Sequence, residues 1–386
     1  MSDGYTTAFV DLGWDGPKIG LEYEGAHHQT ERGVRPVSLS ANLGIPPSRR
    51  VRAMKSRAAI VRDMGGAWSV EDFELDSPRA GEVLVQMAAA GLCHSDDHIR
   101  NGFMSPPGGP RTRPPTIGGH EGSGIVVEVG PGVAELAAGD HVVTSFVAVC
   151  GHCRWCACGM EYLCDKGAGV LIPGMPTDGT FRHHTLDGQD VGHTSKIGAF
   201  AEHTVVASDS LVKIDQDIPL VPAALLACAI PTGYGSSVHR GNVRGGDTAV
   251  WACDAVDLVR DLTRGVMADC VVVAPSDITG DDVRDALALT RKGGTCVLTG
   301  MAPAGRLPVQ LDIQDLVLMN KTLCGTVFGS CNPRSEIPLL ARMYTAGQLQ
   351  LDEMITRRYH LDDMNTAFDD LLRGELVRGV IDFGIA

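Results

Sequence analysis

Four cysteines between residues 150 and 164 are spaced C-x2-C-x2-C-x7-C. They are Cys150, Cys153, Cys156 and Cys164, while Cys158 falls outside the pattern. Short C-x2-C steps place successive thiolates on one tight turn, so four sulfurs can close a tetrahedron around zinc. An iron–sulfur cluster would accept the same ligands, whereas a disulfide framework needs an oxidising compartment and usually a small chain. In a chain of 386 residues the spacing favours a structural zinc site.

A second set of zinc-type ligands is more scattered. Cys93 follows Gly91-Leu92, His120 lies in Gly118-Gly119-His120-Glu121-Gly122, and Cys228 precedes an apolar stretch. A catalytic zinc is typically held by three protein ligands, with the fourth position left to water or substrate. A lone cysteine is most often a small buried apolar residue. Beside the four-cysteine run, however, this set predicts a second, catalytic zinc.

Together, the two patterns resemble those of the zinc-dependent alcohol dehydrogenases of the medium-chain dehydrogenase/reductase superfamily. The resemblance extends from about residue 54 to the C-terminus. It implies an α/β fold with a GroES-like, β-rich catalytic domain that carries two zinc ions per chain, and a Rossmann-type domain that binds NAD(H). The expected divisions are an extension and linker over 1–53, the catalytic domain over 54–215, the Rossmann-type domain over 216–340, and a C-terminal segment, 341–386, that returns to the catalytic domain.

The resemblance also implies roles for polar residues around the catalytic zinc. Ser95 and His98 would relay a proton to solvent, because zinc lowers the pKa of an alcohol but the released proton must still leave. Asp96 would hydrogen-bond the imidazole of His120 and fix its orientation, and Glu121 would lie close behind the metal. The positions that match cofactor contacts are His94, Thr232 and Arg378. For the polar residues around the zinc, Ser95, Asp96, His98 and Glu121, the alternative is an ordinary solvated loop residue.

The expected dinucleotide fingerprint is missing. Thr248 to Trp251 reads as the first Rossmann strand, which should lead into G-x-G-x-x-G, where glycines permit the tight turn and the close approach of the pyrophosphate. Here the chain continues Ala252-Cys253-Asp254-Ala255-Val256-Asp257. All three glycine positions carry side chains, and Asp254 and Asp257 place negative charge where a pyrophosphate would lie. NAD(H) binding is therefore doubtful.

The loss extends beyond these glycines. A helix predicted over 258–267 leads directly to a strand at 269–274 that resembles the fourth strand of the family. On the order of 50 residues, two βα units, are missing. In the order 3-2-1-4-5-6 the missing strands 2 and 3 form an outer edge, so strands 1-4-5-6 remain contiguous, with the last two at 294–300 and 322–328. This predicts an exposed edge at the first strand and less cover on one face.

Residues 1–50 lie outside the resemblance. Segments 10–14 and 19–28 alternate like two strands joined by Asp15-Gly16-Pro17. They resemble the core hairpin of restriction-endonuclease-like domains, whose magnesium-binding acids Asp11, Glu22 and Glu24 match in type. The fragment is too short for that fold, so an appended segment followed by a linker over 33–55 is expected.

Residues 165–205 are rich in Gly, His and Thr. His183, His184 and His193 cluster in the sequence, but no fixed ligand spacing supports another metal site. A surface loop or a loop on the substrate side is the prediction.

Composition bounds the class of protein. A net charge of -14 argues against nucleic acid or an anionic membrane as partner. Twelve cysteines favour a reducing cytoplasm, and no run approaches 18 apolar residues. By resemblance, the strand at 322–328 would pair two copies into a homodimer.

Three functions remain open. The first is a zinc alcohol dehydrogenase acting on a small alcohol or carbonyl compound. The second is a zinc hydrolase or lyase that works without a cofactor. The third is an inactive remnant that folds around zinc.

Overall fold

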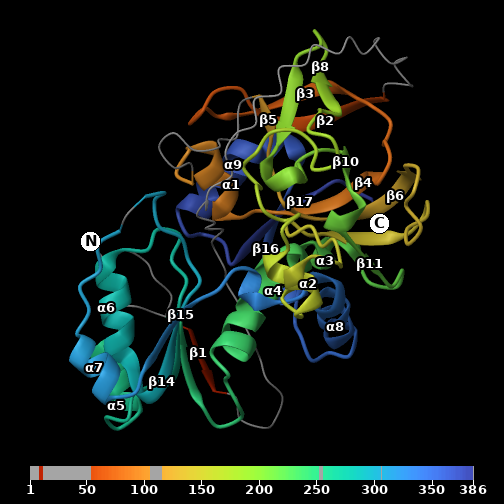
Figure 1. The fold of residues 1–386 in the computed structure, drawn as a ribbon. Coiled ribbons are helices and arrows are strands. Elements are labelled where there is room, and N and C mark those ends of the chain that lie inside the picture. Colours follow the sequence, from red (N-terminus) through yellow and green to blue (C-terminus); the bar gives the residue numbers. More distant parts are fainter. Residues whose placement is uncertain (1–7, 12–53, 105–114, 252–254, 306, 386) are drawn as a thin grey trace.

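The computed structural model describes residues 8–11, 54–104, 115–251, 255–305 and 307–385. These residues form two halves (Figure 1). One half, hereafter the catalytic half, contains a closed barrel and a seven-stranded sheet. The other, the nucleotide half, contains a five-stranded sheet with helices α5, α6 and α7 beside it.

The closed barrel runs β2-β3-β8-β9-β5. Its strands are β2 (Met54–Val61), β3 (Trp68–Leu75), β5 (Thr116–Ile117), β8 (His183–Thr185) and β9 (Asp190–His193). Ile60, Phe73 and Ile117 fill its interior and are fully buried. His183 is also fully buried. The predicted loop over 165–205 is therefore wrong in part, because two barrel strands and β10 (His203–Ala207) form there.

The larger sheet has the order β11-β7-β6-β4-β17-β16, and β10 also pairs with β4. Its other strands are β4 (Glu82–Gly91), β6 (Glu121–Val129), β7 (His141–Thr144), β11 (Leu211–Ile214), β16 (Ile355–Tyr359) and β17 (Arg378–Asp382). β17 pairs antiparallel with β4, so the C-terminal segment lies in the catalytic half. β4 is central and almost wholly buried, so the residues that follow it, Leu92 and Cys93, begin from a well-packed strand.

Helical segments of the catalytic half pack on this sheet and on one another. Those that contact the sheet are α3 (Leu220–Ala223), η4 (Ala224–Ala227), α8 (Pro333–Thr345) and α9 (Met364–Leu372). Of the others, α1 (His94–Arg100) contacts α9, and α4 (Ala229–Gly235) contacts η4 and α8. Leu225, Ile230 and Ile337 belong to the same buried core as Val85 and Val380 of the sheet. The nucleotide half is therefore shorter at both ends than the predicted range 216–340.

Among the described residues, no single helix has the length and apolar character to cross a bilayer. A bent pair, Leu220–Ala227 with Ala229–Arg240, meets the length and composition test at an angle of 52°. Its apolar residues Leu225, Leu226 and Ile230 are buried in the catalytic core, as in a core helix of a globular domain.

The nucleotide half contains four parallel strands in the order β12-β13-β14-β15. They are β12 (Thr248–Trp251), β13 (Ala268–Val273), β14 (Thr290–Leu298) and β15 (Thr322–Gly325), with helices α5 (Val256–Leu262), α6 (Gly280–Leu289) and α7 (Ile313–Leu318). Val250, Val271 and Leu289 are fully buried between sheet and helices. The predicted contiguous order of these strands is confirmed.

The predicted exposed edge at β12 is wrong. β1 (Ala8–Asp11) lies antiparallel beside β12, with Ala8 opposite Trp251 and Asp11 opposite Thr248 (Figure 1). Backbone pairing there satisfies polar groups that an edge strand would leave open. The other parts of the predicted N-terminal hairpin, including Glu22 and Glu24, and residues 33–53 of the predicted linker lie outside the described residues, whereas Met54 and Lys55 begin β2.

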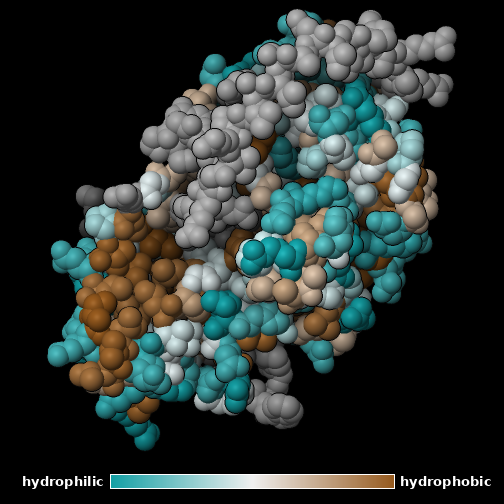
Figure 2. Space-filling model, viewed as in Figure 1, coloured by the Kyte–Doolittle hydropathy of each residue, from teal (hydrophilic) through white to brown (hydrophobic). Residues whose placement is uncertain are grey.

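Apolar side chains are exposed on the helices of the nucleotide half (Figure 2). The most exposed fractions are 61% for Leu262, 66% for Val317 and 70% for Leu318. They lie on α5 and α7, in the half of the molecule where Figure 2 shows an apolar area on its left side.

Candidate metal centres

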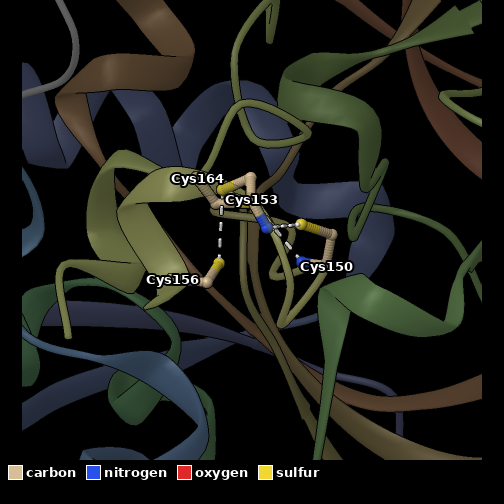
Figure 3. Close-up of side chains that lie close together, drawn as sticks. All are labelled: Cys150, Cys153, Cys156 and Cys164. Atoms are coloured by element: carbon tan, nitrogen blue, oxygen red, sulfur yellow. Dashed lines mark hydrogen bonds between the residues drawn. The ribbon is translucent and has the colours of Figure 1, made fainter. Parts of the chain in front are cut away.

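The four-cysteine run forms one compact cluster (Figure 3). Cys153 directly precedes α2 (Arg154–Ala157), Cys156 lies within it, and Cys164 follows η1 (Glu161–Leu163). The Sγ atom of Cys153 lies 3.5 Å from that of Cys156 and 3.9 Å from that of Cys164. Two backbone N–H groups also donate to the sulfurs. The Cys150 N–H donates to Sγ of Cys164 and the Cys153 N–H to Sγ of Cys150, both at 3.3 Å. This local geometry encloses a single site.

The electrostatics of this cluster fit a divalent cation. Backbone N–H groups lower the pKa of Cys153 to about 6, whereas burial and the neighbouring thiols raise the pKa of Cys156 to about 12. Four thiolates this close repel one another unless a cation binds them, and thiolate is the form that zinc takes. The donor set suits zinc with no open position.

The second cluster joins three distant parts of the chain. Cys93 lies between β4 and α1, His120 directly precedes β6, and Cys228 lies between η4 and α4. One ligand atom from each, together with a carboxylate oxygen of Glu121, lies within 4.8 Å of all the others, and all four residues are buried. Nε2 of His120 is buried and accepts or donates no hydrogen bond within the described chain. Two thiols and this nitrogen fit a three-ligand zinc site.

Glycine places His120. The Phe200 N–H donates to the Gly118 carbonyl and the Ala199 N–H to the Gly119 carbonyl, both at 2.9 Å. Gly119 has φ +87°, and a Cβ there would lie 2.6 Å from the Phe200 nitrogen. A larger residue would push this segment away and carry the adjacent His120 with it.

Asp96 fixes the ring of His120. Its Oδ1 atom accepts a hydrogen bond from the Gly119 N–H and lies 3.1 Å from Nδ1 of His120. Asp96 is fully buried. A carboxylate on Nδ1 keeps that nitrogen protonated, so Nε2 is the nitrogen available to a metal.

Behind this cluster lies a buried ion pair that the sequence did not predict. Nη2 of Arg378 donates to Oε2 of Glu121 at 2.5 Å, and the two side chains are 3% and 0% exposed. Burial raises the pKa of Glu121 to about 8, although Arg378 acts in the opposite direction. A Cβ on Gly91 would lie 2.4 Å from Glu121 Oε2, so Gly91 makes room for this carboxylate. Arg378, expected at the cofactor, thus binds Glu121.

The other predicted residues lie around the same centre. The Cys93 thiol donates to Ser95 Oγ at 3.5 Å, and Ser95 is 1% exposed. His98 is buried three residues further along α1 and stacks on Phe103 with ring centroids 4.3 Å apart. His94 begins α1. Thr232 lies on α4, with Oγ1 4.0 Å from Sγ of Cys228.

Two aromatic residues at this centre were missed. The ring of Phe146 meets the His120 imidazole edge-on at 5.6 Å, and Phe328 meets Phe146 at 5.3 Å. Both are at most 3% exposed. Single phenylalanines carry no spacing signal, and only long-range pairing brings them to the site.

Comparisons with known proteins agree with this arrangement. Residues 79–216 match the alcohol dehydrogenase GroES-like domain, and residues 246–346 match the zinc-binding dehydrogenase family. The chain is 39% identical to the NDMA-dependent alcohol dehydrogenase of Amycolatopsis methanolica, over 85% of this chain and 99% of that one. It is 40% identical to the putative alcohol dehydrogenase D of Mycobacterium tuberculosis, over 85% and 100%.

Solved structures show the same fold. An alcohol dehydrogenase zinc-binding domain protein from Burkholderia ambifaria superimposes with a TM-score of 0.77 at 25% identity, over 86% of this chain and 99% of that one. Benzyl alcohol dehydrogenase from Acinetobacter calcoaceticus gives 0.74 at 24% identity, over 85% and 99%. The chain therefore belongs to the zinc-dependent alcohol dehydrogenases of the medium-chain dehydrogenase/reductase superfamily, and it is an oxidoreductase of that type.

Proposed function

We propose that this protein interconverts small alcohols and carbonyl compounds at a zinc ion held by Cys93, His120 and Cys228, and that it binds free NAD(H) only weakly. The observation that carries the first part is the buried convergence of two thiols with the Nε2 atom of His120. When bound, zinc supplies a Lewis acid that lowers the pKa of an alcohol and polarises a carbonyl group. A second zinc in the four-cysteine cluster would be structural.

The residues around this centre would transfer the proton, orient His120 and exclude water. The Ser95 hydroxyl would accept the proton of the alcohol while it gives its own proton to His98, on the same face of α1, which would release it toward solvent. Asp96 keeps His120 oriented through the 3.1 Å contact. Phe146 and Phe328 form an apolar wall that excludes water from the reacting atoms.

Weak dinucleotide binding follows from what the nucleotide half lacks. The alignment with the Amycolatopsis relative is 374 positions long, but it includes only 85% of the 386 residues of this chain. Some positions of the relative therefore have no counterpart here. This supports the loss of strands 2 and 3 between β12 and β13. The adenosine half of a dinucleotide would then have no acidic residue for its ribose and no glycine turn for its pyrophosphate.

An activity assay tests the proposal. Zinc-loaded protein is given primary alcohols with NAD as acceptor, and in parallel with NDMA, because one relative is named for its dependence on it. We expect turnover that is lost in Cys228→Ser, and a rate that still rises with NAD at millimolar concentration. Turnover that survives Cys228→Ser would refute the assignment of the centre.

The second candidate function is a zinc enzyme that needs no cofactor. It is favoured by Asp254 and Asp257, whose negative charge would oppose binding of a pyrophosphate. Ester hydrolysis without any nucleotide, lost in Cys228→Ser, would favour a zinc hydrolase over a dehydrogenase.

We further propose a homodimer that forms along β15 and α7. β15 pairs with β14 on one side and forms the outer strand of the described sheet. Ile313, Val317 and Leu318 of α7 are 59%, 66% and 70% exposed. An open strand edge beside apolar side chains suits a second copy of the chain. Light scattering should find a dimer for the wild type and a monomer for Val317→Asp; an unchanged dimer would exclude this surface.

A reducing compartment such as the cytoplasm is proposed on the same grounds as the zinc sites. Every cysteine in the described part of the chain is a free thiol. Zinc binding requires reduced thiolates, which an oxidising compartment would convert to disulfides. Mass spectrometry of the native protein after thiol alkylation should find all cysteines alkylated once zinc is removed, and a disulfide would contradict this.

A further inference from the structure

A third group of metal-type ligands lies outside both zinc sites. It consists of His239, Cys331 and Glu336, and one ligand atom from each lies within 4.8 Å of the other two. His239 belongs to η5 (Ser236–Arg240), Cys331 follows η6 (Phe328–Ser330), and Glu336 lies in the first turn of α8. The group therefore spans the junction where two segments distant in sequence meet.

The side chains are already arranged toward one another. Nε2 of His239 lies 2.6 Å from Oε2 of Glu336. The other carboxylate oxygen, Oε1, accepts the Asn332 N–H at 3.0 Å, which holds Glu336 in this orientation. The Cys331 thiol is fully buried beneath them. Little rearrangement would be needed for one ion to replace the direct contact between His239 and Glu336.

Access to the group is open on one side. The His239 and Glu336 side chains are 35% and 13% exposed, so an ion can enter from solvent and keep a water as its fourth ligand. We propose that His239 Nε2, Cys331 Sγ and a Glu336 carboxylate oxygen bind one divalent transition-metal ion of the zinc class. Imidazole and thiolate ligands favour such ions over Mg²⁺ or Ca²⁺, which prefer oxygen.

Without an ion, the same residues form an ordinary polar contact. His239 and Glu336 make an ion pair, and the Cys331 thiol donates to the Pro231 carbonyl at 3.0 Å. Binding of a metal would release the thiol proton of Cys331 to solvent, replace the S–H bond by a metal–sulfur bond and tie η5 to the start of α8. Because η5 continues the helix that begins after Cys228, the ion would stabilise the segment that carries this catalytic ligand.

A metal titration tests the site independently of alcohol oxidation. Tag-free protein that already holds two zinc ions per chain is titrated with Zn²⁺, and separately with Co²⁺, whose thiolate complexes absorb in the near ultraviolet. We expect one further equivalent, a thiolate absorption band with Co²⁺, and a higher melting temperature. His239→Gln should weaken this binding at least about tenfold, and Cys331→Ser should remove the absorption band.

Cys158→Ser is the matched control, because Cys158 is exposed and belongs to none of the three clusters. It should retain the further equivalent. His239 is partly exposed, so its substitution leaves the fold intact and keeps the test valid even where Cys331→Ser is unstable. The absence of a further equivalent in the wild type, or its persistence with unchanged affinity in His239→Gln, would overturn the proposal.

Discussion

In the catalytic half, the seven predicted zinc ligands gather into two clusters, whereas the nucleotide half forms a parallel sheet whose first strand is not followed by the residues of G-x-G-x-x-G. The parallel sheet survives because Val250, Val271 and Leu289 need only apolar neighbours to be buried. A ligand site depends on particular atoms at particular places. A sheet can therefore pack with few strands, whereas the proposed weak binding of a dinucleotide follows from side chains at the three glycine positions.

The largest effect is expected from Cys150→Ser in the four-cysteine cluster. Loss of one ligand should release the structural zinc and several kcal/mol of the about 10–16 kcal/mol that such sites supply. Metal analysis should find about one zinc per chain instead of two, with lower solubility. Cys158→Ser, which alters an exposed cysteine beside the cluster, should change neither quantity. Two zinc ions retained in Cys150→Ser would show that the cluster is not a zinc site.

A smaller effect is expected from Asp96→Asn, which weakens the hold on His120. Removal of such an orienting carboxylate typically costs 10–100-fold in metal affinity. Competition with a chelator should therefore show weaker binding of one zinc and unchanged binding of the other. Asp97→Asn is the control, because Asp97 pairs with Arg100 instead of His120. Equal zinc affinities in the two variants would contradict the role of Asp96.

A pH effect is expected in the barrel of the catalytic half. Burial lowers the pKa of His193 to about 3, with Lys196 acting in the same direction, and burial also lowers the pKa of His183. Below about pH 6.5 the unfolded chain binds protons that the folded barrel excludes. The stability that the two neutral histidines contribute is therefore fully present above that pH. It is lost as the pH falls, by about 1.4 kcal/mol per pH unit for each histidine.

Urea unfolding at several pH values measures this dependence. Between pH 6.5 and 5, the free energy of unfolding should change less steeply with pH in His193→Gln than in the wild type. The difference in slope should correspond to about one bound proton. An unchanged slope in His193→Gln would show that His193 is protonated alike in the folded and unfolded chains.

The smallest effect is expected from restoring glycines in the nucleotide half. A variant with Ala252→Gly, Asp254→Gly and Asp257→Gly should gain less than about tenfold in NADH affinity, or about 1.4 kcal/mol, because the proposed loss of the second strand would leave no acidic residue for the ribose. Asp254→Asn with Asp257→Asn separates the effect of charge from that of the glycine turn. A gain of a hundredfold would mean that the glycines alone were limiting.

Local patterns in the sequence predicted most of the sites and much of the fold. The C-x2-C steps predicted the four-cysteine cluster, because residues three apart lie on one turn. The apolar runs predicted the strands β12 to β15. Contacts between distant residues were not predictable in this way. The Arg378 pair with Glu121, the packing of Phe146 on His120, and the pairing of β1 with β12 depend on strand register that no local pattern encodes.

The same reason explains the histidines of the barrel. His183 and His193 looked like members of a polar loop, since histidine and glycine are common in loops. Pairing of β8 with β9 brings them together, with His183 opposite Val191 and fully buried and His193 half-buried. Short strands with polar residues can be identified only once their neighbours in the barrel are known.

A fluorescence titration of the zinc-loaded protein with NADH tests most directly whether the two halves differ as described. Because zinc content is verified in the same sample, a failure to bind cannot be attributed to an unfolded catalytic half. We expect no saturation below about 100 µM, the concentration that corresponds to about 5 kcal/mol of binding free energy. Saturable binding below that concentration would contradict the account, since the shortened nucleotide half would then hold a dinucleotide without its glycine turn.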